Sequence, residues 1–183
     1  MGLIREREPA KFVASLLTCR LDLLPEVRQA LEQALGNIDY VSPSLPFVQT
    51  SYYEKEMGSC LQREIVTFAA LRDAGDLSTA KRLTNELEQR WAEGGRRRVN
   101  IDPGYITLGK FVLATTKDQS HRIYIGQGIF AEVTLRYRNK TFEPWEWTYP
   151  DYGSGPYITL LNELRRQYQQ QLKQRPQMNT DNA

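Results

Sequence analysis

Apolar residues recur along the chain with two kinds of spacing. Nearly continuous apolar runs predict strands, and apolar residues every three or four positions predict helices. Residues 11–18 are an almost unbroken apolar run, which is typical of a buried central strand. After Pro25, apolar residues recur every three or four positions up to Gly36, which predicts an amphipathic helix. Two prolines interrupt residues 38–50, so this segment is predicted to be an edge strand or a bent one.

The same order of elements repeats in the next part of the chain. Residues 61–69 predict a strand, and residues 77–91 predict a second amphipathic helix. A strand is then expected over residues 97–101, ending at a turn formed by Asp102-Pro103-Gly104. Residues 110–116 predict one more strand.

The last third of the chain begins with the clearest hairpin signal. Residues 121–135 are two β-rich runs around Gly126-Gln127-Gly128, and such a short glycine loop is typical of a hairpin. Residues 141–147 predict a short additional strand. A final helix is expected to begin near Gly155 or Pro156, because a new apolar stripe with helical spacing follows.

Together these elements predict an α+β fold, with a mostly antiparallel sheet and three helices packed on one of its faces. The two strand–helix–strand halves fit a duplicated, ferredoxin-like arrangement. The expected organisation is a flexible N-terminus over residues 1–10, a single α+β domain over residues 11–173 and a disordered tail over residues 174–183.

Composition narrows the class of protein. The 183 residues are 40% hydrophobic, which is enough for a core, and 24 basic against 22 acidic side chains leave a net charge of +2. A dedicated nucleic-acid-binding protein usually has a clear basic surplus, so nucleic acid is disfavoured as a partner. Cys19 and Cys60 fit a reducing compartment, and neither a signal peptide nor an apolar run of membrane-spanning length is visible. The predicted location is therefore the cytoplasm, without a membrane partner.

Six sequence blocks, spread in order along nearly the whole chain, resemble those of a known family. The blocks are Tyr52–Gly58, Val99–Tyr105, Leu113–Lys117, His121–Tyr124, Gly128–Leu135 and Trp147–Tyr152. They are similar to the bacterial domain-of-unknown-function family DUF4416 over roughly residues 11–170. The resemblance implies a bacterial protein and no established activity. A P-loop is absent, because Gly109-Lys110 leads to Phe111 where that motif needs Ser or Thr.

The hairpin carries the first candidate site. If its loop is Gly126-Gln127-Gly128, Ile125 pairs with Ile129 and Arg122 lies directly opposite Glu132. Tyr124, Phe130 and Thr134 would share this polar and aromatic face. The alternate residues, Ile123 and Val133 among them, would form the face that points to the core.

The functional interpretation of this face is an anion site that can transfer protons. Arginine and lysine hold phosphate or carboxylate groups, and histidine, of which the chain has one, is the side chain suited to proton transfer near neutral pH. The predicted catalytic residues are His121 and Glu132, and the predicted substrate-binding residues are Lys117, Arg122, Tyr124 and Asp102. The competing interpretation is a cross-strand ion pair that only stabilises an exposed sheet face.

Three carboxylates, Asp102, Glu132 and Asp151, suggest a Mg²⁺ or Mn²⁺ site if they converge, since these ions prefer oxygen ligands. Nothing in their spacing requires convergence, and both aspartates can serve as turn formers. We therefore assign no residue as a metal ligand.

Two further segments have a functional and a structural interpretation. Residues 52–58 could line a pocket with their tyrosines and glutamates, or pack against the core. The aromatic residues Trp145, Trp147, Tyr149 and Tyr152 could stack on bases and Arg96–Arg98 could contact phosphates, or they could cover a core and face water.

The sequence thus favours a small cytoplasmic protein that binds or acts on a phosphorylated or carboxylated metabolite, a nucleotide being one case. A non-catalytic protein-interaction module and an RNA-binding protein remain alternatives. Whether the protein is an enzyme, which cofactor it uses and whether it forms a homodimer stay open at this level.

Overall fold

The structure is a computed structural model that describes residues 7–48 and 54–175, with the backbone alone for Glu54 and Lys55. Residues 1–6, 49–53 and 176–183 lie outside the described residues. The predictions for most of the N-terminal segment, for most of the tail and for Tyr52 and Tyr53 fall there.

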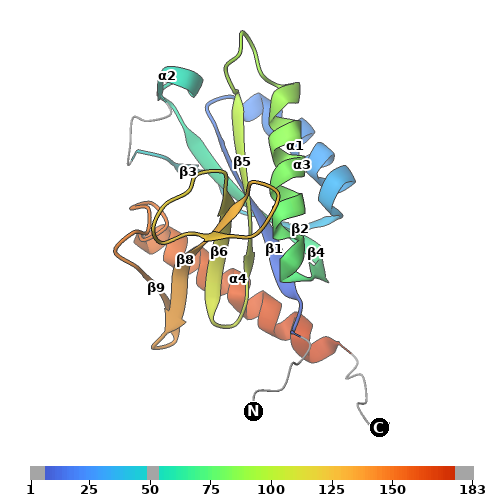
Figure 1. Cartoon of the computed structure of the whole chain (residues 1–183), viewed down its shortest axis with the longest axis vertical. Helices are drawn as coiled ribbons and strands as arrows, with labels where there is room; N and C mark the ends of the chain where they lie inside the picture. The colour runs from blue at the N-terminus through green and yellow to red at the C-terminus, as the bar shows by residue number, and fades with distance from the viewer. Residues whose placement is uncertain (1–6, 49–53, 176–183) are drawn as a thin grey trace.

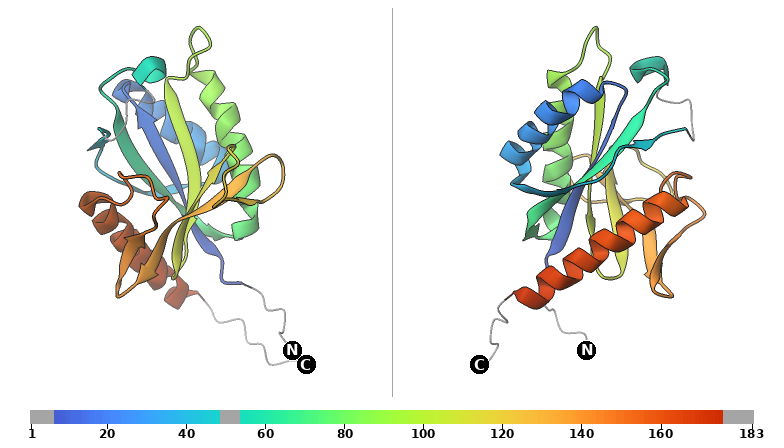
Figure 2. Two further views of the ribbon diagram at one scale, coloured as in Figure 1. Left: turned by 60° about the vertical axis from the view of Figure 1, so that its left-hand side comes forward. Right: turned by 180° about the vertical axis from the view of Figure 1, so that it is seen from behind.

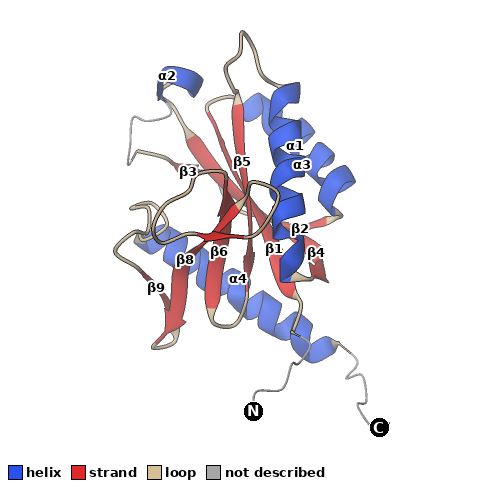
Figure 3. Ribbon diagram, in the orientation of Figure 1, coloured by secondary structure: helices blue, strands red, loops and turns tan. Residues whose placement is uncertain are grey.

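The described chain contains three long helices, one short helix and nine strands (Figure 1 and Figure 3). The strands are β1 (Ala10–Thr18), β2 (Ile38–Val41), β3 (Leu45–Pro46), β4 (Gln62–Arg72), β5 (Val99–Ile106), β6 (Lys110–Thr115), β7 (Ile123–Tyr124), β8 (Phe130–Arg138) and β9 (Thr141–Pro144). The helices are α1 (Leu24–Leu35), α2 (Glu54–Met57), α3 (Leu77–Arg90) and α4 (Gly155–Gln174). The predicted α+β class with an antiparallel sheet and three main helices is confirmed.

The first half of the chain forms a ferredoxin-like unit. Strands β5, β1, β4 and β2 pair in that spatial order, all antiparallel, while the chain runs β1–α1–β2 and then β4–α3–β5. Helices α1 and α3 cover the same face of these strands, over a core cluster that includes Phe12, Leu16 and Leu31. The two predicted strand–helix–strand halves therefore combine into one such unit.

The second half extends this sheet and covers its other face. Strands β6, β8 and β7 follow β5 in order, and β9 pairs with β8. Helix α4 crosses the face opposite α1 and α3 (Figure 2), where Phe111, Leu161 and Tyr168 belong to a second core cluster. The prediction that all helices pack on one face is wrong. The physical reason lies in β1, whose nine residues are all buried because both faces of the strand are covered.

Strand β5 continues through Asp102-Pro103-Gly104, so the turn predicted there is wrong. Pairing between β5 and β6 starts at Gly104, opposite Leu113, and Pro103 has no N–H with which to extend it. A Cβ on Gly104 would lie 2.3 Å from the carbonyl oxygen of Val112, so the close approach of the two strands depends on glycine. Among the described strands, none pairs with the β6 side of β5 before this point, which leaves a gap in the sheet.

The β7–β8 hairpin has the predicted register, but the predicted burial of its two faces is only partly correct. The Ile125 N–H donates to the Ile129 carbonyl at 2.9 Å, and this register sets Arg122 against Glu132. The predicted assignment of faces is correct only in part. Ile125, Ala131 and Val133 pack against a core cluster as expected, but Ile123 is 70% exposed and Glu132 on the polar face is buried. The polar face of the hairpin points toward the gap beside β5. Arg122 and Glu132 on this face are therefore buried and not exposed to solvent.

Candidate functional site

A cavity of about 780 Å³ occupies the gap in the sheet beside β5. Its lining comes from β4, α3, β5, the end of β6 with the residues after it, the hairpin and residues 149–152. The hairpin reaches across to α3 (Figure 1), where the Gln127 side-chain amide donates to the Ser78 hydroxyl at 3.3 Å. The volume lies in the range of about 300–1,000 Å³ that is usual for small-molecule sites.

Helix α3 turns a polar stripe toward this cavity. Lys81, Asn85 and Glu88 line it and lie on one face of the helix, since residues three and four apart are neighbours. The Lys81 ammonium donates to the Ile101 carbonyl at 3.0 Å, and the Glu88 carboxylate accepts the Ile101 N–H at 2.7 Å. The Asn85 amide has no hydrogen-bond partner within the described ranges.

Strand β5 supplies the neighbouring carboxylate. One oxygen of Asp102 accepts from the Lys81 ammonium at 2.8 Å, and the other accepts from the Asn100 amide at 2.6 Å. Burial raises the pKa of Asp102, but Lys81 and Asn100 outweigh burial and hold the pKa below its ordinary value. For Glu88, burial dominates over the nearby Lys81 and raises the pKa above its ordinary value. One wall of the cavity therefore holds two carboxyl groups with different proton affinities.

Arg97 connects this wall to α2. Its guanidinium makes two hydrogen bonds of 2.8 Å to the Glu56 carboxylate and one of 2.7 Å to the Asn100 amide oxygen. The Arg97 hydrogen bonds lower the pKa of Glu56, so this ion pair persists at neutral pH. The pair fixes Arg97 at the edge of the cavity.

Arg63 of β4 carries a buried charge in the lining. The residue is 6% exposed, and its guanidinium lies 4.9 Å from the ring centre of Phe47 and 4.7 Å from that of Tyr152. The Asp151 carboxylate lies 2.7 Å away, but neither Nε nor Nη1 of Arg63 makes a hydrogen bond of acceptable geometry. Burial opposes the charge on Arg63, yet Tyr152 and Asp151 outweigh it and raise the pKa, so the group stays cationic.

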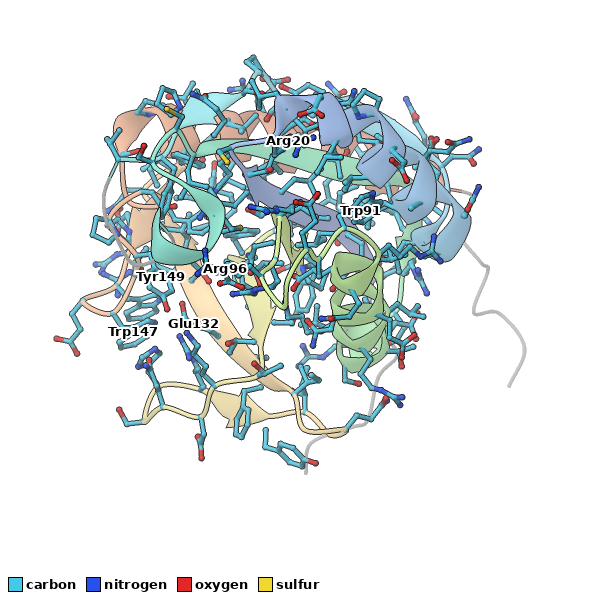
Figure 4. All side chains as sticks on the ribbon, turned by 90° about the horizontal axis from the view of Figure 1, so that it is seen from above. Arg20, Trp91, Arg96, Glu132, Trp147 and Tyr149 are labelled. Carbon is cyan, nitrogen blue, oxygen red and sulfur yellow. The ribbon has the colours of Figure 1, made fainter. Side chains whose placement is uncertain are left out.

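The hairpin forms the opposite wall with a buried ion pair. The Arg122 Nε donates to the Glu132 carboxylate at 2.9 Å, and the His121 Nε2 lies 3.1 Å from the same oxygen. The other Arg122 nitrogens donate to the Lys117 carbonyl at 3.0 Å and to the Tyr149 hydroxyl at 3.4 Å. The side chains of Arg122 and Glu132 are only 2% and 3% exposed, which contradicts the interpretation as an exposed ion pair. Figure 4 shows Glu132 with Trp147 and Tyr149, while Arg20 lies apart from them beside α1.

The aromatic segment after β9 stacks on itself. Trp147 stacks on His121 with ring centres 5.4 Å apart, and Trp145 stacks on Trp147 at 5.0 Å. The Arg136 guanidinium covers the outer face of Trp145 at 4.2 Å. These faces are occupied within the chain, so they do not form the open stacking platform considered from the sequence. The stack fixes His121 against Glu132.

The structure brings together five of the six residues predicted for the site. Lys117, Arg122, Glu132 and Asp102 line the cavity, and His121 contacts Glu132. Tyr124 lies elsewhere: it is 60% exposed on β7, packs beside Phe130 and accepts a hydrogen bond from the Gly128 N–H.

The three carboxylates considered for a metal also line the cavity, but each lies against a different cation. The pairs are Asp102 with Lys81, Glu132 with Arg122, and Asp151 with Arg63. In the parts of the chain that the structure describes, no three His, Cys, Asp or Glu side chains form a group that could hold a metal ion. The three consecutive arginines do not act together either, because Arg97 enters the cavity while Arg98 pairs with Glu93.

Sequence reasoning missed Lys81, Glu88 and Arg63, and it considered Arg97 only as one of three consecutive arginines that could contact phosphates. The signal for the first two was present, because charges on the predicted core stripe of a helix are rarely buried without a partner. Arg63 likewise stands in a predicted buried strand. Nothing in the sequence distinguishes Arg97 from its two neighbours, since it precedes β5 and reaches the cavity only through the tertiary fold.

The fold and the cavity define an α+β protein with a ferredoxin-like core, an extended sheet and a pocket beside β5 that is lined by charged side chains of both signs. The chain belongs to the family described as Domain of unknown function (DUF4416), whose model matches residues 8–168. No match to the chain was found among curated proteins or among solved structures. Within the described ranges, every helix is too short or too polar to cross a lipid bilayer.

Proposed function

We propose that this protein binds a small phosphorylated or carboxylated metabolite in the cavity beside β5. The observation that carries the proposal is the gathering of five cationic side chains around one cavity. They are Arg63, Lys81, Arg97, Lys117 and Arg122. Four carboxylates line the same cavity and Glu56 pairs with Arg97 at its edge, so most of these cations are held around the cavity by neighbouring carboxylates.

Arg63 is the cation best prepared to hold an anion. Its guanidinium is almost fully buried between two aromatic rings, and two of its nitrogens have no hydrogen-bond acceptor in good geometry. A buried donor without an acceptor is costly, by about 1–3 kcal/mol, so an incoming carboxylate or phosphate oxygen would relieve that cost. The planar guanidinium also suits two-point binding of either group.

A proton-transfer role for His121 and Glu132 is the catalytic part of the proposal. It is supported by their 3.1 Å contact and by the position of Glu132 in the lining. A nucleotide is one candidate among phosphorylated ligands. The cytoplasm remains the proposed location, supported by the free thiols of Cys19 and Cys60.

A thermal-shift screen at low salt tests the binding proposal. The panel holds inorganic phosphate, sugar phosphates, nucleotides and dicarboxylates. A ligand at a hundred times its Kd adds about 2.7 kcal/mol of stability, which raises Tm by on the order of 5–10 °C for a chain of this size.

The variant R63M/D151N removes the buried cation together with its partner, and R20Q removes an exposed cation that lies outside the cavity lining. The expected result is a ligand-induced shift that disappears in R63M/D151N and persists in R20Q. A shift of equal size in both variants, or no shift with any anion, would refute the proposal.

A further inference from the structure

Asp102 is an unexpected residue to find in an anion-binding cavity. Its carboxylate lines the cavity, and its side chain keeps 29% exposure. Each of its oxygens already accepts one hydrogen bond, from Lys81 and from Asn100. An ionised carboxylate has room for about four hydrogen bonds, so about two positions remain for a ligand.

A ligand that carries only negative charge would be repelled by this carboxylate. The part of the ligand beside Asp102 must therefore donate hydrogen bonds. Lys81 already places an ammonium 2.8 Å from Asp102, and a second cation at the same point would meet like-charge repulsion. A neutral donor satisfies both conditions, and a hydroxyl group is the commonest neutral donor on phosphorylated and carboxylated metabolites.

Asn85 offers a second polar contact near the same place. It lies one helical turn beyond Lys81 on α3, lines the cavity and is half-buried. Its amide has no partner within the described ranges, so both its N–H donors and its oxygen are open to a ligand. The exposed Gln89 lines the same wall one further turn along α3.

We infer that the ligand carries neighbouring hydroxyl groups next to its anionic group, and that Asp102 and Asn85 bind these hydroxyls while the arginines hold the anion. This inference rests on the proposed function and narrows its substrate class to hydroxylated phosphates and carboxylates, such as sugar phosphates, hydroxy acids and ribonucleotides. A cavity of about 780 Å³ accommodates ligands of this size.

Pairs of probes that differ only in hydroxyl groups test the inference by isothermal titration calorimetry. Glycerol 3-phosphate is compared with propyl phosphate, glycerate with propionate, and ribose 5-phosphate with 2-deoxyribose 5-phosphate. Sites built to hydrogen-bond a hydroxyl discriminate strongly against its absence, so the hydroxylated member of at least one pair should bind about tenfold tighter or more. Adenosine 5′-monophosphate distinguishes a nucleotide ligand from a sugar phosphate. If it binds more tightly than ribose 5-phosphate, the ligand is a nucleotide, and if the two bind equally, the ligand is a sugar phosphate.

The variant N85A should lower the affinity for the preferred hydroxylated probe about tenfold and leave its deoxy or alkyl partner within about twofold, since only a hydroxyl contact is removed. D102N also removes a negative charge beside Lys81 and changes the affinity for every anion, so its readout is the ratio of the two affinities within a pair, which should fall about tenfold. Q33A, which removes an exposed amide on α1, is the matched control. Circular dichroism verifies that each variant is folded, and N85A provides the test if D102N fails to fold.

Two results would overturn the inference in distinguishable ways. Equal binding of both members in every pair would overturn the inference that the ligand carries hydroxyl groups, but it would not affect the proposed anion-binding function. The absence of binding by all phosphates and carboxylates would remove the proposed function and this inference with it.

Discussion

At the scale of single residues, the cavity is a set of charges that are each held by a neighbour. Arg122 pairs with Glu132 and Arg63 with Asp151, both buried, while the pair of Arg97 with Glu56 is partly exposed. A buried ion pair contributes little net stability compared with apolar packing, but the loss of one partner leaves an uncompensated charge. Such costly pairs around one cavity are easier to understand as parts of a binding site than as a device for stability.

The Arg122–Glu132 pair gives a stability prediction. The substitution Glu132→Ala should lower the free energy of unfolding by about 3–5 kcal/mol, because Arg122 is left buried and unpaired. Urea denaturation measures this change. The double variant R122M/E132M should be clearly more stable than E132A, because it leaves no unpaired charge. If the loss in free energy of unfolding for the double variant equals the sum of the losses for R122M and E132M alone, the account is contradicted.

Glu88 gives a prediction about pH. Burial raises the pKa of Glu88 in the folded protein, so as pH rises past the ordinary glutamate value the unfolded chain loses its proton first. The contribution of this group to stability therefore falls with rising pH until the folded-state pKa is passed. The variant E88Q lacks this titration, so its stability relative to the parent protein should rise over that pH window and then level off. Urea unfolding at a series of pH values measures the difference, and a flat or falling difference would refute the assignment.

At the scale of elements, the separation of β5 from β6 creates the site. Gly104 permits close contact at one point, and Pro103 comes directly before it. On the N-terminal side of Gly104, β5 presents Asn100 and Asp102 to the cavity, where they meet side chains from α3. The segment that looks like a turn in the sequence is thus the place where the sheet opens.

Gly104 provides the test of this contact. The substitution Gly104→Ala would bring a Cβ to 2.3 Å from the Val112 carbonyl oxygen, so the strands must move apart. Overpacking of this kind costs about 1–3 kcal/mol, or more where backbone is involved. Gly109→Ala is the control, because its added Cβ would meet no atom within 4 Å. Equal stability of the two variants in thermal unfolding would contradict the proposed role of Gly104.

The elements of this fold could be predicted from the sequence because each depends on local periodicity. The bounds of α1 and the start of α4 follow from their apolar stripes, and the hairpin register follows from its short glycine loop. Which face of each strand is buried could not be predicted from local periodicity. Which side of β8 is buried depends on where the hairpin docks, and that depends on residues far away in the chain.

Part of the site could be predicted from the sequence, because that part depends on local register. Arg122, Glu132 and His121 meet within one hairpin, and local register brought them together. Arg63 and Lys81 come from other elements, and only the tertiary fold places them across the cavity. Their burial at apolar positions was the available signal, since a charge in a core stripe requires a partner.

At the scale of the whole molecule, a ferredoxin-like half and a strand extension meet around one cavity. The first half supplies Arg63, Lys81 and Asp102, and the extension supplies Lys117, Arg122 and Glu132. The hairpin contact between Gln127 and α3 joins the two parts across the opening. Because the cations come from both parts, an anion bound between them should stabilise the fold as a whole.

The central claim is that this cavity binds an anionic metabolite, and its most direct test is a two-dimensional ¹H–¹⁵N NMR titration with glycerol 3-phosphate. The account predicts saturable shift changes at the backbone amides of Asn100, Asp102 and Thr115–Lys117 and at the Arg63 side-chain Nε–H, all of which belong to residues of the lining. Changes confined to exposed cations such as Arg20, or no changes up to millimolar concentrations, would contradict it.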